Sequence, residues 1–79
     1  MSPDDLKALL SRRPFLPFRL HVSGSFTYDV TFPEAALLSR SVLVIGVKRD
    51  IDSPYFDGPI WVALRHIIQA EPILDGASA

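Results

Sequence analysis

The sequence contains no cysteine and no long apolar run. The first absence excludes a disulfide scaffold and a cysteine-ligated zinc site. A membrane-spanning helix needs about 20 consecutive apolar residues, so we expect no membrane segment. The opening Ser2-Pro3-Asp4-Asp5 also lacks the basic start of a signal peptide, and we therefore expect a cytoplasmic protein.

An excess of positive charge is also missing, because the formal net charge is −1. General nucleic-acid-binding proteins are usually clearly basic, which counts against that class. The 79 residues are enough for one domain with a small core. Hydrophobic residues make up 48% of the chain, so we expect a folded protein that buries part of its apolar surface against another subunit.

The most regular pattern in the chain is an alternation of apolar and polar residues from Phe18 to Phe32. A period of two is typical of a strand with one buried face and one solvated face. The segment 23–25, with Gly24 at its centre, interrupts the pattern and predicts a hairpin turn. The alternation assigns Phe18, Phe26, Tyr28 and Phe32 to the core.

One helix precedes this hairpin and further short strands follow it. Ser2 and Pro3 are typical of a helix start, and the spacing of Leu6, Leu9 and Leu10 gives one apolar stripe. Pro14 ends this helix, which we place at about residues 3–13. Strands are expected at 41–47, 60–64 and 67–71, while residues 35–39 are compatible with a bent continuation of the hairpin strand or with a turn of helix.

No helix stands between the strands to allow a parallel crossover, so the sheet should be antiparallel. The expected fold class is mainly β, a small α+β protein. In it, the N-terminal helix precedes a five-stranded, strongly bent antiparallel barrel at about residues 17–72. Residues 73–79 are expected to form a frayed tail, and the whole chain, 1–79, is expected to be a single domain.

The expected strand 41–47 is β-branched and carries no charge, so an unpaired edge there would associate with another chain. We therefore expect a homo-oligomer with Val42 and Val44 at its edge. The alternative is that the helix or the long loop covers this strand.

The polar loop from Lys48 to Pro59 is long for so small a domain, and such loops often carry specific function. Its exposed aromatic and basic residues are candidates for contact with an unknown protein partner: Tyr55, Phe56, Lys48 and Arg49. The alternative is that Tyr55 and Phe56 fold back over the core as a cover.

The layout of one helix and five short strands resembles the Sm-like fold, in which a short turn joins strands four and five. The segment from Trp61 to Pro72 is similar to the last two strands of the Hfq RNA chaperones, with Arg65 and His66 as the basic residue and the histidine. Other features, such as the Gly24 hairpin and Pro33-Glu34, resemble a group of short bacterial proteins of uncharacterised function. The resemblance implies an SH3-like barrel that pairs strands between neighbours into a ring.

The Hfq resemblance also implies a uridine-binding pore at Arg65 and His66, and Arg12 and Arg13 are the further candidates for phosphate contacts. We expect RNA binding as the alternative function and not as the first, because nine acidic residues offset eight basic ones.

Motifs for chemistry are scarce. Asp50, Asp52 and Asp57 lack the spacing of a calcium loop and fit turn formation. His21 and His66 have no nucleophile or carboxylate partner in any recognisable motif. We therefore expect no catalytic residues, no metal site and no cofactor, and retain an enzyme or metal protein only as a remote alternative. The function expected from the sequence is a non-catalytic, self-associating interaction module.

Overall fold

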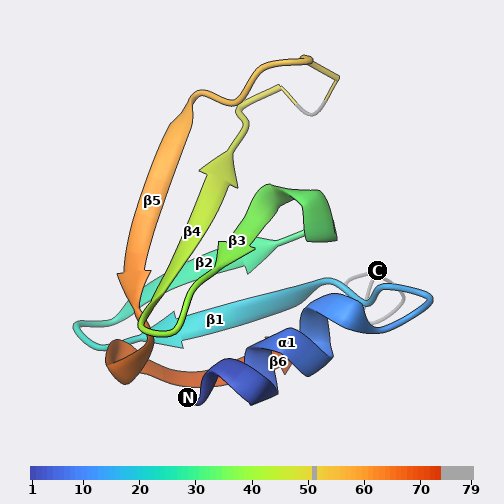
Figure 1. The fold of residues 1–79 in the computed structure, drawn as a ribbon. Helices are drawn as coiled ribbons and strands as arrows, with labels where there is room; N and C mark the ends of the chain where they lie inside the picture. Colours follow the sequence, from blue (N-terminus) through green and yellow to red (C-terminus); the bar gives the residue numbers. More distant parts are fainter. Residues whose placement is uncertain (51, 74–79) are drawn as a thin grey trace.

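The computed structural model describes residues 1–50 and 52–73, which form one N-terminal helix and two three-stranded antiparallel sheets (Figure 1). The elements are α1 (Pro3–Ser11), β1 (Phe18–Val22), β2 (Phe26–Val30), the 3-10 turn η1 (Pro33–Ala35), β3 (Ala36–Leu38), β4 (Val42–Val47), β5 (Gly58–Ala63), the 3-10 turn η2 (Leu64–His66) and β6 (Ile67–Pro72). The first sheet has the order β2-β1-β6 and the second has the order β3-β4-β5.

Helix α1 begins as its sequence predicts. The Ser2 hydroxyl accepts a hydrogen bond from the Asp5 amide at 3.2 Å, and Pro3 occupies the first turn. Leu6 is completely buried, which anchors the helix on the core. The helix ends at Ser11, two residues before the predicted end, because Arg12 already has an extended backbone.

The predicted hairpin is confirmed as β1 and β2, paired from Phe18 with Val30 to Val22 with Phe26. Gly24 (φ 88°) and Ser25 (φ 67°) both take left-handed conformations in the turn. The prediction that Phe26 belongs to the core is wrong, since its side chain is 59% exposed. Phe26 is the first residue of β2 and directly follows the turn.

The predicted five-stranded barrel is not observed, because neither three-stranded sheet closes on itself. Pro33 opens the turn η1 between β2 and β3, and a proline has no amide with which to continue a strand ladder. The bent strand expected at 35–39 is therefore reduced to Ala36–Leu38, which pairs with β4 in the second sheet.

The prediction that β4 forms an edge is also wrong. Strand β4 is the centre of its sheet, with β3 on one side and β5 on the other. Val42 and Val44 are therefore hydrogen-bonded within the chain and do not offer a free strand edge. The sequence could not show this, because strand order depends on contacts between distant segments.

The core lies between the two sheets and α1. Its buried members come from every layer: Leu6, Phe18, Leu20, Val30, Leu43, Ile45, Val62, Leu64 and Ile67. At the C-terminal side, the Ile73 amide donates to the Pro17 carbonyl at 3.0 Å, so the prediction that residue 73 belongs to a frayed tail is wrong. The rest of the predicted tail, residues 74–79, lies outside the described residues. Neither α1 nor any other helix of the described residues has the length and apolar character needed to cross a bilayer.

Candidate functional site

The outer face of the β3-β4-β5 sheet is apolar throughout. Pairing places Leu37, Val44 and Trp61 in one row across the three strands. Because side chains alternate along a strand, the neighbours Leu43 and Val62 point inward and are buried. Leu37 and Trp61 are each 71% exposed. We use the name outer face for Leu37, Val42, Val44, Pro59, Trp61 and Ala63, none of which carries a charge.

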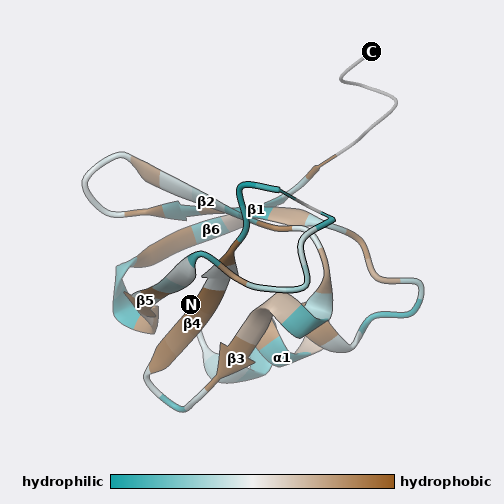
Figure 2. Ribbon diagram, turned by 90° about the horizontal axis from the view of Figure 1, so that it is seen from above, coloured by the Kyte–Doolittle hydropathy of each residue, from teal (hydrophilic) through white to brown (hydrophobic). Residues whose placement is uncertain are grey.

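The ends of the outer face carry opposite charges. Glu34, in η1, lines a hollow of about 300 Å³ together with Gly46 and Pro59 at one end. At the other end lie Arg40, in the turn between β3 and β4, and Arg65, two residues after β5. All three charged side chains are exposed. In the view from above, the ribbons of β3 and β4 have mostly the brown colour of hydrophobic residues (Figure 2).

Lys48 connects the loop between β4 and β5 to Phe32, which follows β2. Its ammonium lies 5.4 Å from the centre of the Phe32 ring and 4.9 Å from that of the Phe56 ring. Lys48 Nζ also donates to the Ser53 carbonyl at 2.9 Å. The Phe32 and Phe56 rings stack with their centres 6.3 Å apart. Phe56 folds back onto Phe32 and is 44% exposed, whereas Tyr55 is 78% exposed. The expectation that this loop contacts a protein partner stays a prediction.

The acidic residues of this loop make local turn contacts, as predicted. Asp57 Oδ2 accepts from the Arg49 amide at 2.6 Å, and Asp50 Oδ1 accepts from the Asp52 amide at 3.0 Å. Arg49 itself is exposed. Within residues 1–50 and 52–73, no three His, Asp or Glu side chains gather closely enough to hold a metal ion.

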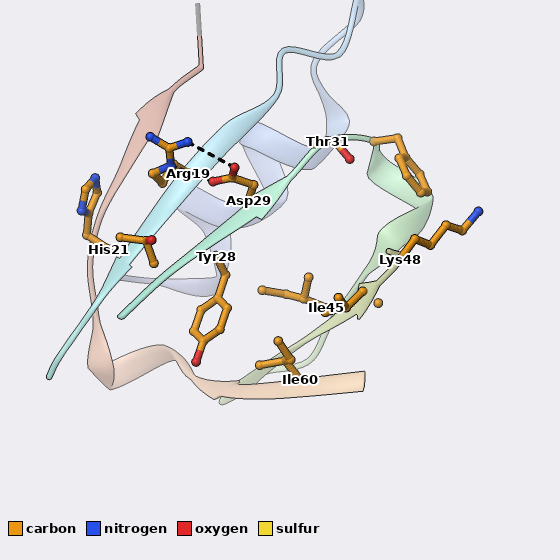
Figure 3. A pocket seen from close by; sticks show the side chains of 12 residues that line it. Arg19, His21, Tyr28, Asp29, Thr31, Ile45, Lys48 and Ile60 are labelled. Carbon is orange, nitrogen blue, oxygen red and sulfur yellow. Dashed lines mark hydrogen bonds and ion pairs between the residues drawn. The ribbon is translucent and has the colours of Figure 1, made fainter. Parts of the chain in front are cut away.

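A groove of about 600 Å³ runs beside β2, between the hairpin and the end of β4 (Figure 3). Arg19 and Asp29 meet on the hairpin side through two hydrogen bonds of 2.8 and 3.2 Å. Ile45, Ile60 and Lys48 lie across the groove from this pair. The groove thus has one polar wall and one apolar wall.

The hydrogen bonds that Arg19 donates to the Asp29 carboxylate, followed by the negative charge of Asp29, raise the pKa of the Arg19 guanidinium above its ordinary value. Because the folded protein holds the Arg19 proton more tightly, the charged guanidinium stabilises the fold. This stability contribution is complete below the ordinary pKa and is lost only as pH rises through the raised pKa. The contribution of Arg19 is therefore constant around neutral pH. On the same strand, His21 Nε2 lies 3.0 Å from Glu71 Oε1 on β6.

The predicted RNA-binding residues fall into two separate groups. Arg65 and His66 lie in η2, close to the start of α1, since the Met1 amine is 3.3 Å from the Leu64 carbonyl. Arg12 and Arg13 follow the other end of α1, about 14 Å away along a helix of nine residues. Arg13 Nη1 donates to the carbonyls of Leu10 and Arg12.

His66 does have an aromatic neighbourhood. It lines a hollow of about 340 Å³ together with Ser23, Tyr28 and Trp61. The sequence placed His66 and Trp61 in neighbouring elements but did not reveal that they share a hollow with the first hairpin. It also missed the Leu37–Val44–Trp61 row, because strand register is set by non-local pairing; the only sequence signal is the lack of charge on alternate positions of all three strands.

No protein-family model, no curated protein and no solved structure matches this chain.

Proposed function

We propose that this chain is a non-catalytic interaction module that self-associates through the outer face. The observation that carries the proposal is the row of Leu37, Val44 and Trp61, apolar across three strands and largely exposed at both ends. A row of this kind is unusual on a monomer and is typical of surfaces that meet another protein. Val42 and Val44 contribute by their side chains on this face and not as a strand edge.

The energetics favour an association that depends on concentration. Burying a large apolar side chain contributes about 1.5–3 kcal/mol, so Leu37 and Trp61 from two copies contribute roughly 6–12 kcal/mol. Association costs about 4–15 kcal/mol in lost translational and rotational freedom. The two terms are similar in size, and the remaining members of the outer face decide the balance.

The charge distribution indicates what the face would meet. In a two-fold symmetric dimer the same patch is used by both copies. If the two faces meet with their strands antiparallel, Glu34 of one copy lies near the arginine end of the other, where Arg40 and Arg65 stand. A second copy of this chain is therefore complementary to the outer face in both hydrophobicity and charge.

The sequence resemblance to Sm-like proteins is a separate argument for self-association, although those proteins assemble into rings by strand pairing and not through a sheet face. The chain has the N-terminal helix and the short turn, η2, between its last two strands that this resemblance leads one to expect. The exposed Tyr55, in the loop between β4 and β5, gives the assembly a further contact point for an unidentified protein partner.

The proposal is tested by measuring solution mass with light scattering over a range of concentrations. Wild type should form dimers or larger species. Leu37→Lys should remain folded and become monomeric, because a buried ammonium on the face would be unpaired. Phe26→Lys, an equal change at an exposed aromatic on the hairpin, should leave the mass unchanged. A wild-type monomer at all concentrations contradicts the proposal.

A charge exchange tests the two-fold arrangement specifically. Glu34→Arg and Arg40→Glu should each weaken association, and the double variant should restore it. If the double variant is weaker than either single one, the faces do not meet in this orientation.

An RNA-binding role is the second candidate, and the hollow that brings His66 next to Trp61 and Tyr28 favours it. Aromatic side chains beside a basic residue can stack a base and hold its phosphate. The measurement is light scattering with a short uridine-rich RNA at low and high salt. A gain of RNA mass that disappears with salt, and that Arg65→Ala with His66→Ala abolishes, would support this role.

A further inference from the structure

We propose that the groove beside β2 binds an extended peptide segment of another protein, which adds to the free edge of β2 and places an acidic side chain on Lys48. This proposal concerns a different surface from the outer face and does not depend on self-association.

Among the described residues, β2 is an edge strand, with β1 on one side and no strand on the other. An edge strand presents unpaired amides and carbonyls to any chain that approaches in extended form. The free edge of β2 faces the groove, since residues of β2 from Thr27 to Asp29 line it together with β4.

The other three edges carry features that discourage strand addition. Strand β3 has only three residues, and β5 contains Pro59, which has no amide to donate. Strand β6 pairs irregularly with β1 near Val22 and ends in Pro72. Strand β2, by contrast, has five residues in regular register and contains no proline, lysine or bulge. Of the four edges, β2 is the one left open to an incoming strand.

The groove also provides for the side chains of such a peptide. Its apolar lining comes from half-buried Tyr28 on β2 and, across the groove, from half-buried Ile60 and buried Ile45 (Figure 3). Alternate side chains of an added strand would point toward this lining, so apolar residues are expected at every second position. The other positions of the peptide would face the polar wall. Arg19 is already paired with Asp29 there, so uncharged polar peptide residues suit these positions.

Lys48 sets the charge of the occupant. Its ammonium lies near the Phe32 ring, just beyond the C-terminal end of β2, and donates one hydrogen bond to the Ser53 carbonyl. An ammonium has three donors, and no described carboxylate forms an ion pair with Lys48. A peptide carboxylate at this end of the groove would fill a remaining donor position with a charged hydrogen bond.

The test uses terminally blocked, fluorescently labelled peptides of about eight residues, because the five residues of β2 span about 17 Å in extended form. The peptides alternate valine and threonine and carry one aspartate near either the first or the last residue, so that both strand directions are sampled. Binding is measured by fluorescence anisotropy up to about millimolar protein. One of the two peptides should bind, and its amides should perturb the NMR signals of Phe26–Val30.

Three comparisons separate the parts of the proposal. Lys48→Gln should weaken binding about tenfold, the usual weight of a charged hydrogen bond, whereas Lys7→Gln on the exposed side of α1 should not change it. Replacing the peptide aspartate by asparagine should cause the same loss in wild type and no further loss in Lys48→Gln. Methylating alternate peptide amides needs no protein variant and should abolish binding in one of the two alternating patterns only.

The opposite results overturn the proposal. They are failure of both peptides to bind, signal changes at Trp61 and Leu37 in place of β2, equal binding after methylation in either pattern, or an unchanged affinity in Lys48→Gln. Perturbation of β2 by protein concentration alone would show that a second copy occupies the edge, and would also contradict it.

Discussion

The Phe56 ring lies directly on the backbone of Gly46, so that a Cβ placed on Gly46 would be 2.6 Å from Phe56 Cδ1. This contact joins the last part of the long loop, two residues before β5, to the end of β4. It allows Phe56 to stack on Phe32 and, together with it, to flank the Lys48 ammonium. The group that approaches Gly46 is thus a side chain of the loop that follows β4.

The first prediction concerns this contact. Gly46→Ala should displace Phe56 and lower the free energy of unfolding by about 1–3 kcal/mol, the usual cost of overpacking. Gly58→Ala is the matched control, because a Cβ at Gly58 meets nothing within 4 Å; its effect should stay within about 0.5 kcal/mol. Urea unfolding followed by circular dichroism measures both. Equal stabilities of the two variants would show that Phe56 does not need the space at Gly46.

The second prediction concerns the attachment of α1. Leu6 is completely buried between the helix and the sheets, so Leu6→Ala should reduce stability by about 2–5 kcal/mol. A domain of this size has little stability to lose, and the variant should be partly unfolded at room temperature. Leu16→Ala, at a 48% exposed position, should change stability by no more than about 0.5 kcal/mol. A well-folded Leu6→Ala protein would mean that α1 is not essential to the core.

The third prediction concerns the hairpin turn, where Ser25 has a φ of 67°. Glycine takes this left-handed conformation without strain but loses more freedom on folding, so Ser25→Gly should be neutral or stabilising by up to about 1 kcal/mol. Ser23→Gly should be destabilising, since the Ser23 hydroxyl donates to the His66 carbonyl at 3.2 Å. Thermal unfolding should therefore show a lower midpoint temperature for Ser23→Gly than for wild type. The midpoint of Ser25→Gly should be unchanged or higher.

The fourth prediction concerns the Arg19–Asp29 pair on the exposed face of the hairpin. Asp29→Asn should lower stability slightly at low salt, and the difference from wild type should shrink as salt is added, because ions screen exposed charges. Asp52→Asn, which makes the same charge change in the loop, should show less dependence on salt. An Asp29→Asn effect that is the same at low and high salt would indicate a packing role and not an electrostatic one.

The local elements were predictable because short-range rules govern them. Strict alternation gave both strands of the first hairpin, and the positions of Ser2 and Pro3 gave the start of α1. The charge-free stretch at 41–47 gave β4 nearly to its bounds. Each of these patterns depends either on contacts between residues close together in the chain or on which side of a single strand faces solvent.

The candidate site was only partly predictable. The long loop was predictable because turn-forming residues surround Tyr55, and this composition also predicts that Tyr55 is exposed. Arg65 and His66 were predicted to lie together because they are adjacent in the sequence. The outer face was not predicted, since Leu37, Val44 and Trp61 become neighbours only through strand register. Nor did the sequence show that the Lys48 ammonium lies over the rings of Phe32 and Phe56, which come from different segments.

By itself, the sequence determined which stretches become helix and strand, because hydrophobic periodicity and capping act over a few residues. The tertiary structure decided which strands pair, and therefore that β4 is central, that Phe26 is exposed and that two sheets form where one barrel was expected. The physical reason is that strand order and side-chain burial depend on contacts between residues far apart in the chain. The energy of such a contact depends on both segments together, so the local pattern of either segment alone does not predict it.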